Sequence, residues 1–170
     1  MNREQLSIHD KQFSGRLAQW ANASPERGRN GRFRHTLAWI FARTGDSVFW
    51  LAAIAVLFWQ KKQLGWDLLL VVLVTAVLVG ILKGIFRRQR PKEKKAFATD
   101  KYSFPSGHAA RATAVAVTLA FSNPILAPLW LIWAVLVSLA RVALSRHYMS
   151  DVIGGMSVGL LTGLCLQLLT

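Results

Sequence analysis

The sequence predicts an all-α fold, a multi-pass transmembrane helical bundle of about five spans with an amphipathic surface helix at its N-terminus. Two observations support this. The 170 residues are 53% hydrophobic, which is high for a soluble domain of this size. The hydrophobic residues also gather in long runs, and a helix crosses a bilayer with about 20 apolar residues. We therefore expect an integral membrane protein.

Five runs are the expected spans. Three of them carry no formal charge: 68–82, 125–140 and 152–170. Two are less clean: 47–60 and 107–122. Each becomes long enough to cross a bilayer once flanking residues are added.

The N-terminal residues show a different pattern. Four apolar side chains recur at helical spacing and share one face: Leu6, Phe13, Leu17 and Trp20. This pattern predicts an amphipathic helix on the membrane surface. The basic stretch 22–34, with its Gly and Pro, is expected to be a linker. Residues 36–43 fit either a second surface helix or an early start to the first span. We accordingly divide the chain into a membrane-surface segment, 1–46, and a transmembrane domain, 47–170.

The chain is strongly basic, with a net charge of +13 from 21 Lys and Arg against 8 Asp and Glu. In a soluble protein such a balance would suggest nucleic acid, but no aromatic-basic platform or groove-reading motif is present. In a membrane protein it favours anionic lipid headgroups as partners, together with a bias in topology. We therefore expect anionic membrane lipids and no nucleic acid as partners.

The spans, folded antiparallel, bring three blocks of charged residues to one side of the membrane. The loop after the second span (87–106) and the loop between the fourth and fifth spans (144–150) both fall on that side. Charge beside hydrocarbon is costly, so charged residues at the ends of apolar helices indicate a functional site.

The first block is Lys83, Arg87 and Arg90, spaced i, i+4 and i+7, with Pro91 after them. We expect the three cations to share one helical face and Pro91 to end that helix. The following loop, 87–101, is rich in Lys and Arg and attracts anions. Taken alone, such a block commonly only meets lipid headgroups.

The second block is Pro105-Ser106-Gly107-His108, at the start of the third span. Ser106 is expected to be the N-cap, and Gly107 lets a ligand approach the backbone. Free amides at a helix start bind anions, and His108 could pass a proton to a leaving oxygen. A lone histidine at this position would usually be structural.

The third block is Arg141, His147 and Asp151. His147 and Asp151 are i, i+4, so the carboxylate can hold one imidazole nitrogen if the helix extends back to the histidine. The other nitrogen is then nucleophilic. The alternative is that Asp151 caps the last helix and His147 is merely interfacial.

The three blocks resemble the signature of the type 2 phosphatidic acid phosphatase family, which is also similar to the vanadium haloperoxidases and the bacterial acid phosphatases. The family pattern is K-x6-R-P, then P-S-G-H, then S-R-x5-H-x3-D. Ten specified identities match in order over residues 83–151. Ala140 stands where the family usually has Ser, which bears on rate or substrate preference more than on the reaction. Integral members commonly have six spans, and here the first is missing or replaced by the surface helix.

The resemblance implies roles for the site residues. His147 attacks phosphorus and forms a phosphohistidine, Asp151 orients it, and His108 protonates the leaving oxygen. The nonbridging oxygens would be held by Lys83, Arg90, Arg141, Ser106 and the Gly107 amide. Because the sequence has no second acidic cluster for a metal pair, we expect metal-independent turnover with no cofactor.

The expected substrate is a lipid phosphate or pyrophosphate, reached sideways from the bilayer because the loops are short. Phosphatidic acid, phosphatidylglycerol phosphate and polyprenyl pyrophosphate are candidates. Lys and Arg are concentrated on the site side, so the positive-inside rule favours a cytoplasmic-facing site. Glycines at four-residue spacing in the last span predict tight packing within the bundle, with a homodimer as the alternative. A catalytically inactive protein that binds anionic lipids remains the alternative function.

Overall fold

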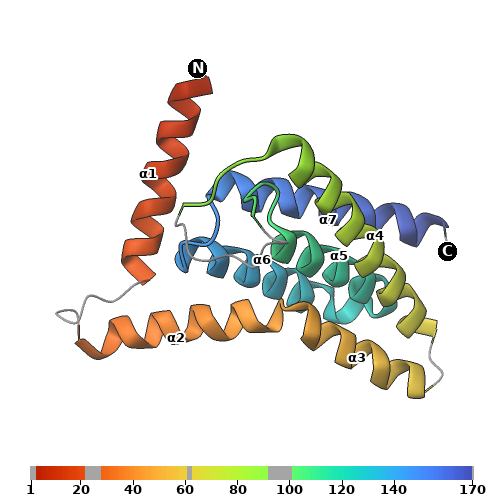
Figure 1. Cartoon of the computed structure of the whole chain (residues 1–170). Helices are drawn as coiled ribbons and strands as arrows, with labels where there is room; N and C mark the ends of the chain where they lie inside the picture. Colours follow the sequence, from red (N-terminus) through yellow and green to blue (C-terminus); the bar gives the residue numbers. More distant parts are fainter. Residues whose placement is uncertain (1–2, 22–27, 61–62, 92–100, 170) are drawn as a thin grey trace.

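The computed structural model describes residues 3–21, 28–60, 63–91 and 101–169. Over these ranges the secondary structure consists of α-helices and a short 3-10 helix, and there is no strand. The all-α prediction is therefore confirmed. Figure 1 shows α5 (Gly107–Ser122) at the centre, between α4 (Gln63–Phe86), α6 (Ala127–Ala143) and α7 (Met149–Leu169). The chain ends lie at opposite sides of the molecule.

Small side chains place α5 at the centre of the bundle. Its inward faces are built from alanines that are fully buried: Ala109, Ala110, Ala112, Ala114 and Ala116. Alanine lets neighbouring helices come close and favours the helical backbone. The start of α5, where Ser106 and His108 lie, is therefore held between three partner helices.

Three helical segments are long and apolar enough to cross a membrane: Gln63–Phe86, Pro124–Ala143 and Met149–Leu169. A fourth results if the bent pair Gly31–Thr44 and Val48–Trp59 counts as one span, with a bend of 46°. The central α5 has 16 residues, fewer than a span of ordinary length. Five spans are therefore not confirmed, because two of the expected runs form short helices.

The glycines of α7 face α5. A Cβ at Gly155 would lie 2.4 Å from the Ser106 carbonyl oxygen, and one at Gly159 would lie 2.1 Å from that of Ala110. At Gly163 a Cβ would lie 2.8 Å from Val117. The predicted packing within the bundle is thus confirmed, because only hydrogen fits at these positions. A homodimer through α7 stays a prediction, and it would have to use another face of the helix.

The N-terminal segment forms two helices, α1 (Arg3–Ala21) and α2 (Gly28–Thr44). In Figure 1, α1 stands across the end of the bundle, where α6 ends and α7 begins. Leu17 packs against the core, whereas Phe13 and Trp20 are exposed. The predicted N-terminal helix is therefore present, and its position on a membrane surface stays a prediction.

Two local expectations were wrong. The predicted linker 22–34 is helical from Gly28 onward, while residues 22–27 lie outside the described residues. The helix that carries Lys83 ends at Phe86, before Pro91, because Arg87 adopts a left-handed backbone with φ 46° and turns the chain. Lys83, Arg87 and Arg90 therefore do not share a helical face. The centre of the basic loop, 92–100, lies outside the described residues.

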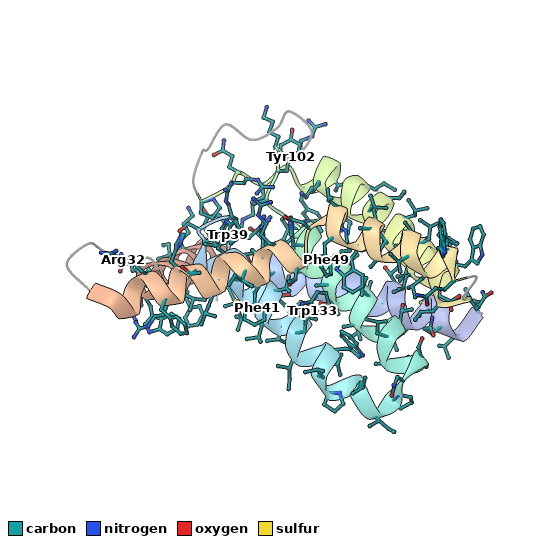
Figure 2. All side chains as sticks on the ribbon, turned by 90° about the horizontal axis from the view of Figure 1, so that it is seen from below. Arg32, Trp39, Phe41, Phe49, Tyr102 and Trp133 are labelled. Carbon is teal, nitrogen blue, oxygen red and sulfur yellow. The ribbon has the colours of Figure 1, made fainter. Side chains whose placement is uncertain are left out.

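The junction of α2 and α3 (Ser47–Trp59) is anchored from several directions. The indole N–H of Trp50 donates to the Thr44 carbonyl at 3.0 Å, and that of Trp133 donates to the Thr44 hydroxyl at 3.0 Å. The Arg111 guanidinium donates to the Gly45 carbonyl at 3.2 Å. Figure 2 shows the labelled Trp133 and Phe49 near this junction. These bonds hold Asp46, one of the two residues between the two helices, in place.

Candidate active site

A cavity of about 320 Å³ lies where the three charged blocks meet. Each block contributes to its lining: Lys83 from the first, Gly107 and His108 from the second, and His147 from the third. The other lining residues come from α4, from the start of α5 and from the α2–α3 junction: Asp46, Thr75, Ala76, Val79, Gly80 and Arg111. The antiparallel arrangement thus brings the blocks together, as the sequence predicted.

His147 lies in the turn between α6 and α7, and it is 2% exposed. The turn is tight: Ser145 has φ 55°, and the His147 N–H donates to the Arg141 carbonyl at 3.3 Å. Because α7 begins at Met149, the helix does not extend back to His147, which was the condition for an i, i+4 pairing with Asp151 along one helix. The imidazole Nδ1 lies 3.7 Å from the Asp151 carboxylate, which is longer than a hydrogen bond.

Asp151 is fully buried and accepts two strong hydrogen bonds. The Tyr148 N–H donates to Oδ2 at 2.8 Å, which caps the start of α7. The Arg88 guanidinium donates to Oδ1 at 2.8 Å. One carboxylate therefore caps the helix and also faces His147. Its ion pair with Arg88 was missed by sequence reasoning, which counted Arg88 only among the basic residues of the loop.

The environment of His147 favours the neutral imidazole. Burial lowers the pKa of His147 to about 4, and the positive charges of Arg141 and Arg90 act in the same direction. The Asp151 carboxylate acts in the opposite direction and only partly offsets them. At neutral pH the ring therefore has a lone pair on one nitrogen, which a nucleophile requires.

His108 faces a second carboxylate. Its Nε2 lies 2.7 Å from Oδ1 of Asp46. Gly45 makes this approach possible, since a Cβ there would lie 2.6 Å from Val137 Cγ1 and 3.5 Å from the His108 ring. Asp46 was not predicted as a site residue, because it is 37 positions from the nearest charged block. The only sequence signal was an acidic residue directly before an apolar run.

Ser106 is at the N-cap position of α5 but does not cap it as expected. Its hydroxyl makes no side-chain cap bond. The hydroxyl is fully buried and has no hydrogen-bond partner among the described residues. The Ser106 N–H donates to the Asp151 carbonyl at 2.9 Å, which ties the starts of α5 and α7 together. An unpaired buried hydroxyl is costly, so it marks a position where a ligand can supply the missing partner.

The remaining predicted cations, Arg141 and Arg90, lie close enough to His147 to affect its pKa. Arg141 is in the last turn of α6. Arg90 reaches the carbonyls of Arg146 and Tyr102 at 3.4 Å each. Within the described ranges no three His, Cys, Asp or Glu side chains are grouped as metal ligands. Metal-independent turnover stays a prediction.

These features define a helical integral membrane protein with two histidine–carboxylate pairs at one cavity. Residues 64–169 match the PAP2 superfamily, and the chain belongs to that family. The resemblance drawn from the three sequence blocks is thereby confirmed.

Three curated relatives are similar in sequence. Phosphatidylglycerophosphatase B of Bacillus subtilis is 35% identical over 135 residues, covering 69% of this chain and 66% of the relative. A probable lipid phosphate phosphatase beta of Arabidopsis thaliana is 32% identical, covering 56% and 61%. Undecaprenyl-diphosphatase of Sulfolobus acidocaldarius is 32% identical, covering 69% and 62%. The chain thus spans less than two thirds of the length of each of these relatives.

Two solved structures have the same fold. A transmembrane PAP2-type phosphatidylglycerolphosphate phosphatase from Bacillus subtilis has a TM-score of 0.78 with 26% identity, over 97% of this chain and 86% of that one. LpxE from Aquifex aeolicus has a TM-score of 0.71 with 23% identity, over 89% and 93%. The second likeness concerns the fold alone.

Proposed function

We propose that the protein is a membrane lipid phosphatase that hydrolyses a phosphate monoester or pyrophosphate through a phosphohistidine. The observation that carries this proposal is the cavity lined by His147, His108 and Lys83, in which each histidine lies beside a carboxylate. Two curated relatives are named for phosphatidylglycerophosphate and for undecaprenyl diphosphate. Those names support the lipid phosphate class.

In the proposed first step, Nε2 of His147 attacks phosphorus, and the bond from phosphorus to the leaving oxygen breaks. Nδ1 faces Asp151, so the carboxylate orients the ring and stabilises the charge that develops on it. His108 donates a proton to the leaving oxygen, which departs as an alcohol or as a phosphate. Asp46 holds the His108 ring during this transfer.

In the second step water attacks the phosphohistidine. The P–N bond breaks, inorganic phosphate leaves, and His147 is restored. His108, now neutral, takes the proton from the attacking water, as microscopic reversibility requires. Phosphoryl transfer gains most from charge placed around the nonbridging oxygens and from in-line positioning.

The substrate phosphate is proposed to be held by the predicted set: Lys83, Arg90, Arg141, the Ser106 hydroxyl and the Gly107 amide. Lys83 and Gly107 line the cavity, and the Ser106 hydroxyl has no hydrogen-bond partner among the residues that the structure describes. Gly107 begins α5, where free backbone N–H groups and the helix dipole favour an anion. Arg111, which lines the cavity as well, adds positive charge.

A lipid substrate suits the wall of the cavity that α4 provides. Ala76, Val79 and Gly80 are apolar or small, and a Cβ at Gly80 would meet nothing within 4 Å. The next apolar residue on this helix, Ile81, is 55% exposed, which fits contact with lipid. We propose that the phosphate enters the cavity past α4 while its tail stays in the bilayer. Phosphatidic acid, phosphatidylglycerol phosphate and polyprenyl pyrophosphate are the candidates.

We propose a cytoplasmic-facing site in the cell membrane. Eight Lys and Arg precede residue 47 and seven lie in 87–101, against Lys61 and Lys62 on the opposite side. Single cysteines at Lys101 or Gln60, in a Cys165→Ser background, test this with a membrane-impermeant maleimide on intact cells. We expect the maleimide to label the cysteine at position 60 and not the one at position 101. Labelling at position 101 alone would place the site on the outer face of the membrane.

Phosphate release tests the reaction itself. Purified protein in detergent with EDTA is offered a panel of lipid phosphates and pyrophosphates, beside His147→Ala. We expect release by the wild type and a loss of at least about 10³-fold in the variant, because no other group replaces the nucleophile. His35→Ala, at an exposed histidine of α2, serves as the matched control and should retain activity. Absence of release by the wild type from every lipid would favour the alternative, an inactive protein that binds anionic lipids.

A further inference from the structure

The N-terminal helix supplies the hydrogen-bond partners for the start of α7. The Met149 N–H donates to the Ser14 hydroxyl at 2.9 Å, and the Ser150 N–H donates to Oδ1 of Asp10 at 3.1 Å. The first N–H groups of a helix have no partner inside that helix. Here α1, well over a hundred positions away in sequence, provides them. The position of Asp151, in the first turn of α7, therefore depends on α1.

Arg88 joins the two carboxylates of this region. Its NH1 donates to Oδ1 of Asp151 at 2.8 Å, and its NH2 donates to Oδ2 of Asp10 at 2.8 Å. The Ser150 hydroxyl contacts both Arg88 and Asp10. The guanidinium also lies over the Tyr148 ring, 4.4 Å from its centroid. A planar guanidinium held at both ends by carboxylates has one orientation.

The charge on Asp10 belongs to this arrangement. Burial opposes ionisation, but the hydrogen bonds from Ser150 and Arg88 outweigh it and lower the pKa of Asp10. Asp10 is thus a carboxylate at neutral pH. Its side chain is 12% exposed and that of Asp151 is 0% exposed, so water competes little for the guanidinium between them. A charge pair shielded in this way is screened less than one on the surface.

We propose that α1 is part of the catalytic unit and that Asp10 is a positioning residue for the proposed reaction. Asp10 fixes Arg88, Arg88 fixes the Asp151 carboxylate, and Asp151 faces Nδ1 of His147. Asp10 touches neither the cavity nor the substrate, and it lies outside residues 64–169, which match the family. The inference rests on the proposed function, since it assigns Asp10 a part in the same reaction.

Steady-state kinetics on the full chain test whether Asp10 positions Asp151 through Arg88. Asp10→Asn keeps an oxygen for the Ser150 N–H but loses the charge that faces Arg88. We expect kcat to fall about tenfold, the lower end of the effect of groups that orient a site ligand, with KM unchanged because the phosphate contacts remain. Asp67→Asn is the matched control, because Asp67 is a partly buried carboxylate of α4 whose hydrogen bond among the described residues comes from Gln63. An Asp10→Asn enzyme as active as this control would overturn the proposal.

A double-mutant cycle distinguishes an effect of Asp10 that acts through Arg88 from a general loss of stability. Because Asp10 acts through Arg88, Asp10→Asn should lower kcat no further in an Arg88→Gln background. If the two substitutions lower kcat independently, so that their effects multiply, Asp10 does not act through Arg88 and the proposal is overturned.

Amide hydrogen exchange provides a readout that needs no substrate. Asp10→Ala removes the acceptor of the Ser150 N–H, so exchange there should quicken at least tenfold while the middle of α7 keeps its protection. If the wild type releases no phosphate, the proposed function fails, and the exchange result still tests the contact between α1 and α7. Unchanged exchange at Ser150 would show that α1 does not hold the start of α7 and would overturn the inference.

Discussion

Nε2 of His108 lies 2.7 Å from Oδ1 of Asp46, so the cavity contains a second histidine–carboxylate pair beside that of His147 and Asp151. The two pairs are built differently. Asp151 follows His147 at i+4 in the sequence. Asp46, in contrast, comes from the junction of α2 and α3, 62 residues before His108. Both carboxylates can orient the ring that they face.

The first prediction concerns Asp46→Asn. If Asp46 orients the proton donor, the variant should lose about 10- to 100-fold in kcat on an alkyl lipid phosphate, below the full effect of a general acid. It should lose little on p-nitrophenyl phosphate, because nitrophenolate leaves without a proton. Both substrates are measured by phosphate release, with Asp67→Asn as the control. Equal losses on the two substrates would contradict a role in protonating the leaving group.

The second prediction concerns Ser106→Ala. The buried hydroxyl has no partner among the described residues, so its removal should leave the melting temperature unchanged or slightly raised. If the hydroxyl binds the substrate phosphate, KM should rise about tenfold, the value of one hydrogen bond to a charged group.

Ser138→Ala is the matched control for Ser106. Ser138 also has a buried hydroxyl without a partner in the described part of the chain, but it lies within α6, whereas Ser106 directly precedes the cavity-lining Gly107. It should therefore leave KM unaltered. A rise in KM in both variants would point to a change in packing rather than to a lost phosphate contact.

The third prediction concerns the contact between α5 and α7. Gly159→Ala places a methyl group 2.1 Å from the Ala110 carbonyl oxygen, so the helices must separate. Overpacking of this kind costs about 1–3 kcal/mol, and the melting temperature in detergent should fall. In Gly84→Ala the methyl group meets nothing within 4 Å, and stability should be equal or higher. Equal melting temperatures for the two variants would contradict the close packing.

The fourth prediction tests the path past α4. Gly80→Leu extends an apolar side chain from the wall of the cavity. The kcat/KM value for a long-chain lipid phosphate should fall at least tenfold, and that for a short water-soluble monoester should fall much less. Gly84→Leu, one turn along the helix and outside the cavity lining, should change neither value. A uniform loss on both substrates would argue against selective obstruction of the tail.

The fifth prediction concerns acid pH and His147. Its pKa is about 4 in the folded protein and about 6.5 when unfolded. Between these values the unfolded chain binds the extra proton, so stability falls as pH drops from about 6.5 to about 4 and His147 adds no further loss below that.

Thermal unfolding of the wild type and of His147→Asn at pH 7.5 and pH 5 tests this. The wild type should lose more stability on acidification than the variant, because the asparagine does not titrate. The acid limb of phosphate release should likewise fall near pH 4. A wild-type loss no larger than that of the variant would show that His147 is not held neutral.

Local sequence patterns were sufficient to predict part of the candidate site. The charged blocks around Lys83, His108 and His147 lie at the ends of apolar runs, and antiparallel spans carry them to the same side. For the blocks to meet at one cavity, consecutive helices needed only to run in alternating directions. The glycine spacing of α7 likewise predicted the tight packing of this helix within the bundle.

Other features could not be read from the chain. A helix end depends on one backbone conformation, and the left-handed Arg87 ended α4 before the proline that was expected to do so. The same local freedom placed His147 ahead of α7 rather than on it. Two short helices, α3 and α5, fall below the length of an ordinary span, so the expected five spans are not confirmed among the described residues.

The amino-acid sequence alone determined that the chain is helical and apolar and that it carries the family's three charged blocks, because composition, periodicity and motif spacing are local properties. Only the tertiary structure decided which carboxylate meets His108 and which two carboxylates Arg88 joins. Asp46 reaches His108, and Asp10 reaches Arg88, through contacts between helices distant in sequence. Such pairings arise from the way helices pack, and no local pattern of residues encodes them.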